Sequence, residues 1–126
     1  MVVDSSALIA ILRNEASAPA LQEKLLTADG VLLSAGNWLE SAMVLSQRDG
    51  GATALNNLLQ IYQIRISPVT TQVAELALDG FLRYGKGRHP AALNFGDCFS
   101  YGLAKFHHAP LLFSGQDFAQ TDVIAA

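Results

Sequence analysis

Short apolar runs alternate along the chain with longer segments in which apolar residues recur at helical spacing. The runs predict β-strands because they are rich in Val, Ile and Leu and end at turn residues. They cover residues 1–3, 31–33, 64–66 and 111–113, and a fifth strand is expected at 123–124. Strands separated by helices are typical of βαβ units, which form a parallel sheet. Ligands bind such sheets beyond the carboxyl ends of the strands.

The longer segments predict helices, and several begin at a residue that can cap a helix. Ser34, either Thr70 or Thr71, and Asn94 carry side chains that accept hydrogen bonds from the amides of a first helical turn. The segment Asp49–Gly51 favours a helix end. The expected helices cover residues 5–12, 18–28, 35–48, 52–62, 71–84 and 95–106.

The amino-acid composition excludes several kinds of protein. The length of 126 residues indicates one domain over residues 1–126, and an apolar content of 51% excludes disorder as the main state. The single Cys98 excludes a disulfide framework and a zinc site built from several cysteines. No apolar run is long enough to span a membrane and no basic, apolar leader is present, so a cytoplasmic location is expected. The 11 acidic and 8 basic residues argue against bulk attraction to nucleic acid, although a local basic patch is compatible with them.

Four acidic residues occur where burial is expected, after strands or in the first turns of helices. Asp4 follows the first strand, and Asp117 follows the fourth. Glu40 lies in the first turns of an otherwise apolar helix, and Asp97 opens the helix at 95–106. Carboxylates brought together repel one another, and a shared Mg²⁺ or Mn²⁺ offsets that cost. Each acid alone also fits a structural role as a helix cap, a solvated side chain or a turn residue. Their joint placement favours a metal site.

The segments that contain these acids resemble the motifs of PIN-domain proteins. Met1–Ala10 has an Asp at the end of a strand, and Ser34–Glu40 is similar to the second acidic motif. Leu93–Lys105 is similar to the third motif, and Leu111–Phe118 followed by Thr121–Asp122 resembles the fourth. The order and spacing fit nearly the whole chain. The VapC toxins of bacterial type II toxin–antitoxin systems are the group that these motifs resemble most.

This resemblance implies an α/β protein with a three-layer α/β/α PIN-like fold around a central parallel sheet. It also implies a Mg²⁺- or Mn²⁺-dependent endoribonuclease that hydrolyses RNA phosphodiester bonds with a metal-activated water. The implied partners are an RNA substrate, a cognate VapB-type antitoxin and a second copy of the chain. The expected assembly is a homodimer, which the antitoxin extends to a heterotetramer or a larger complex.

The resemblance also assigns the site. Carried over by motif, the catalytic and metal-binding residues are Asp4, Glu40, Asp97 and Asp117. Many family members have an acid or Asn where this chain has Gly115, so Asp122 is the alternative to Asp117 as the fourth acid. An ion held by Asp4 and Asp97 can lower the pKa of a bound water and neutralise charge on the phosphate. Glu40 and Asp117 can complete a second metal position or orient the water.

Other polar side chains are expected to support the acids or the substrate. The hydroxyl groups of Ser5, Ser6 and Ser114 can hydrogen-bond the carboxylates or the waters of the metal ion, although a role at the helix start is favoured for Ser6. Arg83, Lys86 and Arg88 surround the loop at residues 85–90 and are candidates for binding RNA phosphates. A solvated surface loop is the alternative interpretation of these charges.

The apolar residues suggest where partners bind. The mean hydropathy of +0.28 is high for a small domain, which indicates apolar surface left for a second copy or an antitoxin. The candidate contact residues lie in the helices at 18–28 and 52–62: Leu21, Leu25, Leu55, Leu58 and Leu59. Core packing of these leucines is the alternative. Four aromatic residues are expected in the core or an interface rather than as platforms for nucleobases: Trp38, Phe95, Phe99 and Phe106.

Two other classes of function are weighed against the nuclease. A haloacid-dehalogenase type of phosphotransfer enzyme needs Asp-x-Asp, and Ser6 stands where the second Asp would be. A P-loop is absent, because Gly85–Gly87 lacks its spacing. A catalytically idle PIN-fold module that binds RNA or protein is the remaining alternative. It is disfavoured because all four acidic motifs are occupied.

Overall fold

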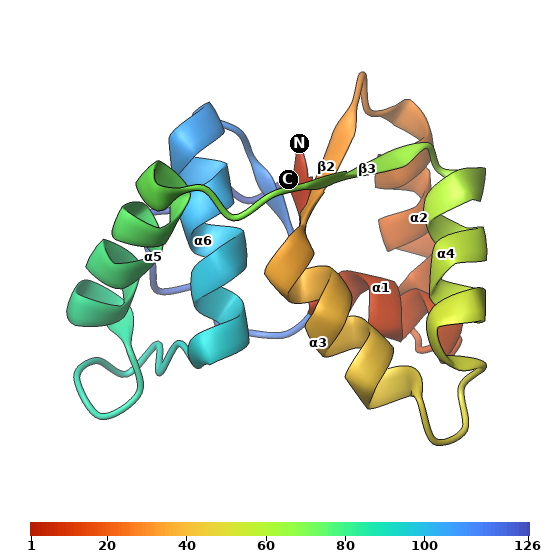
Figure 1. Ribbon diagram of the computed structural model, residues 1–126, viewed down its shortest axis with the longest axis horizontal. Helices are drawn as coiled ribbons and strands as arrows, with labels where there is room; N and C mark the ends of the chain where they lie inside the picture. Colours follow the sequence, from red (N-terminus) through yellow and green to blue (C-terminus); the bar gives the residue numbers. More distant parts are fainter.

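The computed structural model describes all of residues 1–126 and has a four-stranded parallel sheet at its centre. The strand order is β3-β2-β1-β4, so the first strand lies inside the sheet (Figure 1). The strands are β1 Val2–Val3, β2 Val31–Ser34, β3 Ile64–Ser67 and β4 Leu111–Leu112. Because all pairs are parallel, the carboxyl ends of the strands share one edge of the sheet.

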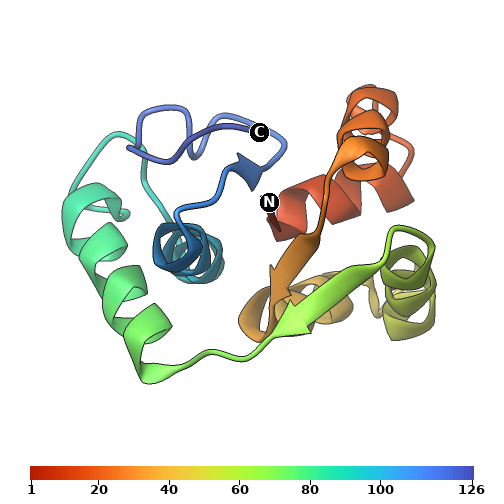
Figure 2. The same cartoon turned by 90° about the horizontal axis from the view of Figure 1, so that it is seen from above.

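Helices cover both faces of the sheet, which confirms the expected three-layer α/β/α architecture. They are α1 Ser5–Leu12, α2 Ala18–Thr27, α3 Ala35–Leu45, α4 Gly51–Ile61, α5 Thr71–Tyr84 and α6 Phe95–His107. Seen from above, α5 and α6 lie on one side of the strands, and α1, α2 and α4 lie on the other (Figure 2). No helix has both the length and the apolar character needed to span a membrane.

Alternation along the strands divides the core into two apolar clusters. Val2 and Leu111 belong to the cluster beneath α5 and α6, whereas Val3 and Leu112 belong to the cluster beneath α1, α2 and α4. Successive residues of a strand point to opposite faces, so two short strands supply both clusters. Tyr101 of α6 is completely buried in the first cluster.

The leucines expected to contact partners are core residues. Leu21, Leu25, Leu55, Leu58 and Leu59 are all buried in the cluster beneath α1, α2 and α4. The prediction of a contact surface from these residues is therefore wrong. The apolar stripes of α2 and α4 pack against the sheet and against α1.

Three predicted N-cap residues are confirmed, whereas the prediction of a fifth strand is wrong. Ser34 accepts a hydrogen bond from the amide of Gly36, and Thr70, rather than Thr71, accepts one from Val73. In the C-terminal segment only Ala125 forms a bridge to Leu111, so residues 123–124 do not form a strand. The preceding residues fold into turns, which leaves only a short segment to meet the edge of the sheet.

Candidate active site

Asp4 lies at the carboxyl end of β1 and is held by three hydrogen bonds. Its Oδ2 accepts from the Ser6 amide at 2.9 Å and from the Ser6 hydroxyl at 2.6 Å. Its Oδ1 accepts from the Ser100 hydroxyl at 2.5 Å. Asp4 therefore caps α1, which is the structural role that the sequence offers for this residue. Ser100 of α6 also holds its side chain. Only 3% of the residue is exposed.

A buried amide extends this network to a third helix. The Asn37 side chain donates to the carbonyl of Gly96 at 2.9 Å, and its Oδ1 lies 2.8 Å from the Ser100 hydroxyl oxygen. Asn37 and Ser100 are both completely buried. Sequence analysis missed these residues, although Asn37 precedes Glu40 by one helical turn and Ser100 follows Asp97 by one turn. Such spacing places each of them near an acid on the same helix.

Asp97 caps the start of α6 and faces the other acids. Asn94 and Asp97 form a capping box, in which the Asp97 carboxylate accepts from the Asn94 amide at 3.0 Å. Only 7% of Asp97 is exposed. Burial raises the pKa of Asp97 to about 7, and repulsion from Asp4, Asp117 and Glu40 acts in the same direction. The hydrogen bond from Asn94 opposes this shift but does not cancel it.

Glu40 reaches the site from α3, where it lies directly against the backbone of α6. A Cβ atom on Gly96 would lie 1.3 Å from Oε2 of Glu40, so no side chain fits at residue 96. Burial raises the pKa of Glu40, repulsion from Asp4 adds to the rise, and a hydrogen bond from Ser5 lowers it. Glycine before Asp97 therefore lets acids from two helices approach one another.

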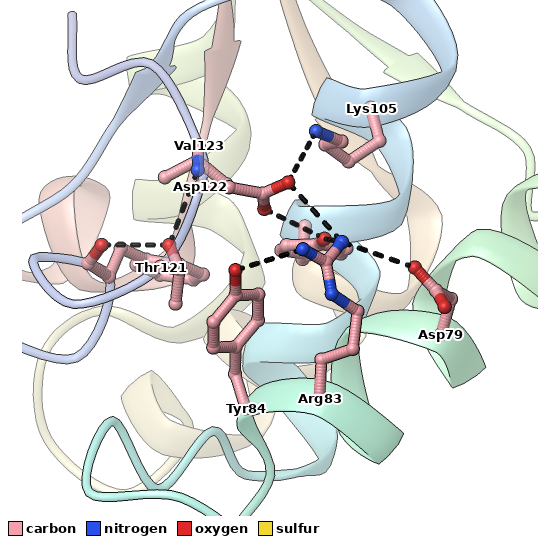
Figure 3. A network of polar contacts seen from close by, with 9 residues as sticks. Asp79, Arg83, Tyr84, Lys105, Thr121, Asp122 and Val123 are labelled. Atoms are coloured by element: carbon pink, nitrogen blue, oxygen red, sulfur yellow. Dashed lines mark hydrogen bonds and ion pairs between the residues drawn. The ribbon is translucent and has the colours of Figure 1, made fainter.

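Asp117 and Asp122, the two candidates for the fourth acid of the site, differ in their contacts. Asp117 is exposed in the turn after β4, near enough for its charge to raise the pKa of Asp97. Asp122 lies in a different network, where it accepts hydrogen bonds from Tyr101 and Lys105, each at 2.9 Å (Figure 3). The geometry favours Asp117 as the fourth acid because the Asp122 carboxylate is already paired with cations.

The expected supporting serines differ in their contacts. Ser5 donates to the backbone carbonyl of Asn37 at 3.2 Å, and it lies near enough to Glu40 to lower the pKa of that acid. The Ser114 hydroxyl lies 3.4 Å from that of Ser17 and does not contact an acid. Instead, the Ser114 amide donates to the Ser6 hydroxyl at 3.0 Å. Ser6, for which the sequence favours a role at the helix start, thus supports Asp4, whereas the Ser114 side chain supports none of the acids.

The site offers carboxylate oxygens that can bind a metal ion, but no positively charged side chain pairs with them. None of the four acids forms an ion pair, whereas Asp49, Asp79 and Asp122 all do. No three of the acidic side chains lie close enough together to ligate one ion directly. The donor set fits a hard divalent ion held by two carboxylates, with the remaining positions filled by water.

The three candidate RNA-binding residues differ in whether their charge is already paired within the protein. Arg83 pairs with Asp79 and Asp122, so its charge is compensated within the protein (Figure 3). Lys86 and Arg88 are exposed in the loop, and the Arg88 guanidinium lies 5.5 Å from the centre of the Phe81 ring. These two residues stay candidates for phosphate binding.

The aromatic residues are only partly in the core. Phe95 is 82% exposed, so it does not lie in the core, and its expected place in an interface stays a prediction. Its ring meets Phe99 edge to face at 4.9 Å. Trp38 is half-buried and donates to Asn56 at 2.9 Å. Phe106, at the other end of α6, is 43% exposed.

A cavity of about 1010 Å³ lies away from the acids. It is bounded by the ends of α2 and α4 and by the beginnings of β2 and β3, and none of the four acids lines it. Asp4 and Asp117 follow the opposite, carboxyl ends of β1 and β4, and Glu40 and Asp97 lie in the first turns of α3 and α6. The candidate active site is therefore a surface at the sheet edge rather than this cavity.

Comparisons with known proteins agree with this fold. A family model of the PIN domain matches residues 1–124. The chain is 47% identical over 126 residues to ribonuclease VapC28 of Mycobacterium tuberculosis, covering 98% of this chain and 95% of that protein. It is 42% identical over 127 residues to ribonuclease VapC of Mycolicibacterium smegmatis, with coverages of 99% and 98%.

Solved structures share the fold at low sequence identity. VapC20 of Mycobacterium tuberculosis, described as a toxin that cleaves the sarcin–ricin loop, superposes with a TM-score of 0.75 at 18% identity. That match covers 99% of this chain and 97% of the other. VapBC2 from Rickettsia felis, solved with a DNA fragment from its promoter, gives a TM-score of 0.76 at 13% identity over 99% and 96% of the two chains.

Proposed function

Because this chain belongs to the PIN-domain family and is similar over nearly its whole length to VapC ribonucleases, we propose that it is an RNA-cleaving toxin. Its active site is formed by Asp4, Glu40, Asp97 and Asp117. The observation that carries this assignment is geometric: Ser100 of α6 bonds the buried Asp4, and Glu40 of α3 lies against Gly96, the residue before the buried Asp97. The raised pKa of Asp97 agrees with this crowding of carboxylates. A buried acidic site without a protein cation suits divalent-metal chemistry on a phosphodiester.

Asp4 and Asp97 would hold Mg²⁺ or Mn²⁺, because both are buried and both lie at the carboxyl edge of the sheet. When bound, the ion supplies positive charge that lowers the pKa of a water and neutralises the phosphate under attack. Glu40 and Asp117 are more exposed and would orient waters beside the ion. These two acids would also accept a proton from the attacking water.

The neighbouring polar residues hold the acids in place before substrate binds. The hydroxyls of Ser6 and Ser100 fix both oxygens of Asp4, and the Asn94 amide fixes Asp97. Gly96 lets Glu40 approach the start of α6. This arrangement leaves few side-chain rotations to be ordered when the metal ion and the RNA arrive. Lys86 and Arg88 would bind phosphates further along the RNA.

Cleavage of a fluorescent RNA tests the nuclease assignment. We expect the wild type to cut the RNA with Mg²⁺ or Mn²⁺ and to stop when EDTA is added. Asp4→Asn and Asp97→Asn should lose cleavage while remaining folded. Asp29→Asn is the matched control, because Asp29 is an exposed acid beside the cavity at the other end of the sheet. Cleavage by the Asp4→Asn variant at the wild-type rate would contradict the proposed site.

An antitoxin of the VapB type is the proposed protein partner. A structure from Klebsiella pneumoniae that shares this fold is described as a toxin–antitoxin complex, and the Rickettsia felis structure is described as VapBC2. The four unpaired carboxylates offer a strong site for an Arg or Lys from the partner. Co-expression with the neighbouring small open reading frame should restore growth that the toxin alone stops.

The proposed homodimer uses a different surface from the one first expected. The large apolar side chains exposed on α3, α5 and α6 are Leu39, Met43, Val44, Leu78, Leu82, Phe95 and Phe106. Burying such side chains against a second copy would remove apolar surface from water. Met43→Glu combined with Leu78→Glu should shift the mass in light scattering from two chains to one. An unchanged dimer mass would place the interface elsewhere.

The alternative is a PIN-fold module that binds RNA or protein without cutting. Metal titration separates the two functions, because an idle module has no need of a divalent ion at Asp4 and Asp97. Saturable Mn²⁺ binding that is lost in the Asp97→Asn variant supports the nuclease.

A further inference from the structure

The segment between β4 and the C-terminal residues carries Asp117 and is fixed at both ends. At its beginning, the Ser114 amide donates to the Ser6 hydroxyl, which in turn donates to Asp4. In its middle, Phe118 is buried and its ring centre lies 5.3 Å from that of Phe113. The segment therefore begins directly at the acidic site.

Asp122 fixes the far end of this segment (Figure 3). Its Oδ1 accepts from the Tyr101 hydroxyl at 2.9 Å, and its Oδ2 accepts from Lys105 at 2.9 Å and from Arg83 at 3.3 Å. Three donors from α5 and α6 thus converge on one carboxylate. Although burial acts in the opposite direction, the hydrogen bonds from Lys105 and Tyr101 and the neighbouring charges lower the pKa of Asp122.

The groups that hold Asp122 are themselves fixed. The Tyr101 ring is completely buried and packs directly against Gly80, where an added Cβ atom would lie 2.4 Å from the ring. Arg83 is also paired with Asp79 at 3.6 Å and donates to the Tyr84 hydroxyl at 3.2 Å. A carboxylate held by rigid donors restrains the backbone on both sides of it.

We propose that Asp122 is a positioning residue, which holds the segment at residues 113–121 so that Asp117 stays beside Asp97. This inference rests on the proposed metal-dependent function, since it gives the position of Asp117 a purpose. The Asp122 carboxylate acts only through Asp117 and does not contact the ion. Breaking its contacts releases the end of the segment and lets Asp117 move away from the other acids.

A double-mutant cycle with Mn²⁺ as the probe tests this role. Calorimetry gives the Mn²⁺ affinity of the wild type, Asp122→Ala, Asp117→Asn and the double variant. We expect Asp122→Ala to weaken Mn²⁺ binding about tenfold, the scale of losses when a group supporting a metal ligand is removed. The same change in the Asp117→Asn background should have no further effect, because the residue that it positions is already disabled.

Hydrogen exchange of the metal-free protein provides a second readout. Asp122→Ala should speed exchange at the amides of residues 114–121 and leave the amides of β1 and α6 protected. The milder Asp122→Asn gives the same comparison if the alanine variant unfolds. Asp49→Ala is the matched control, because Asp49 is also ion-paired, to Arg13 at 3.0 Å, and lies outside this segment. It should change neither Mn²⁺ affinity nor exchange at residues 114–121.

The outcomes separate this inference from the proposed function. Equal losses of Mn²⁺ affinity in both backgrounds, or faster exchange throughout the protein, would overturn the positioning role of Asp122. A wild type that binds no Mn²⁺ would contradict the metal site, and exchange at residues 114–121 would still decide whether Asp122 holds the segment.

Discussion

Gly96 and Glu40 are in direct contact across two helices, with the Glu40 carboxylate occupying the space that a side chain at residue 96 would fill. This contact brings an acid of α3 next to Asp97, the residue that follows Gly96 in α6. The four acids come from distant parts of the chain, so their approach depends on such close packing between elements. A glycine that looks like a local helix residue is therefore part of the site.

Substitution of this glycine should displace Glu40. Gly96→Ala forces the carboxylate away from α6, and overpacking of this kind costs about 1–3 kcal/mol of unfolding free energy. We expect both lower stability in urea and slower RNA cleavage. The Glu40→Ala background removes the clash, so adding Gly96→Ala there should cost much less stability. Equal destabilisation in both backgrounds would show that Glu40 is not the group that Gly96 accommodates.

We expect the Ser100 hydroxyl to contribute to both the stability of the protein and RNA cleavage. Ser100→Ala leaves Oδ1 of Asp4 without its hydroxyl donor and removes the hydroxyl beside Oδ1 of Asn37, and an unsatisfied buried polar atom costs about 1–3 kcal/mol. Stability and cleavage should both fall. Ser41→Ala is the matched control, because Ser41 is also completely buried but its hydroxyl has no hydrogen-bond partner. The control should be neutral or stabilising in thermal unfolding, and a loss equal to that of Ser100→Ala would contradict the role of the network.

The pKa of Asp97 predicts how pH affects the metal-free protein. A folded-state pKa of about 7, compared with about 3.9 in the unfolded chain, means that the folded state binds more protons between these values. The contribution to stability is therefore fully present below about pH 4 and is lost as pH rises through about 7. In EDTA, Asp97→Asn should gain stability relative to the wild type between pH 5 and pH 8, measured by urea unfolding at about these two pH values. A difference between the two proteins that does not change with pH would contradict the raised pKa.

The local parts of this fold could be predicted because their causes lie within a few residues. The caps at Ser34, Thr70 and Asn94 depend on side chains that bond amides two or three residues away. Parallel strands alone predict that Asp4 and Asp117, which follow β1 and β4, lie at one edge of the sheet, whereas Asp97 comes there only through the packing of α6 against β1. The fifth strand failed because pairing beside β4 depends on where the turns after Phe113 direct the chain, which no apolar pattern encodes.

The supporting contacts of the site were harder to predict because they join residues far apart in sequence. Ser100 and Asp4 are separated by 96 positions, and Asn37 reaches Gly96 across 59. The leucines of α2 and α4 failed as predicted contact surfaces for a related reason. An amphipathic pattern shows that one helix face is covered, but the tertiary fold decides whether the sheet or a partner covers it.

The most direct test of the account is the position of a Mn²⁺ ion in crystals of the protein, located by its anomalous scattering. We predict an anomalous peak about 2.0–2.6 Å from carboxylate oxygens of both Asp4 and Asp97, the range over which hard divalent ions bind oxygen. The peak should disappear in crystals of the Asp97→Asn variant. Ordered crystals soaked in Mn²⁺ that show no peak between these two carboxylates, while the same preparation cuts RNA, would contradict the proposed site.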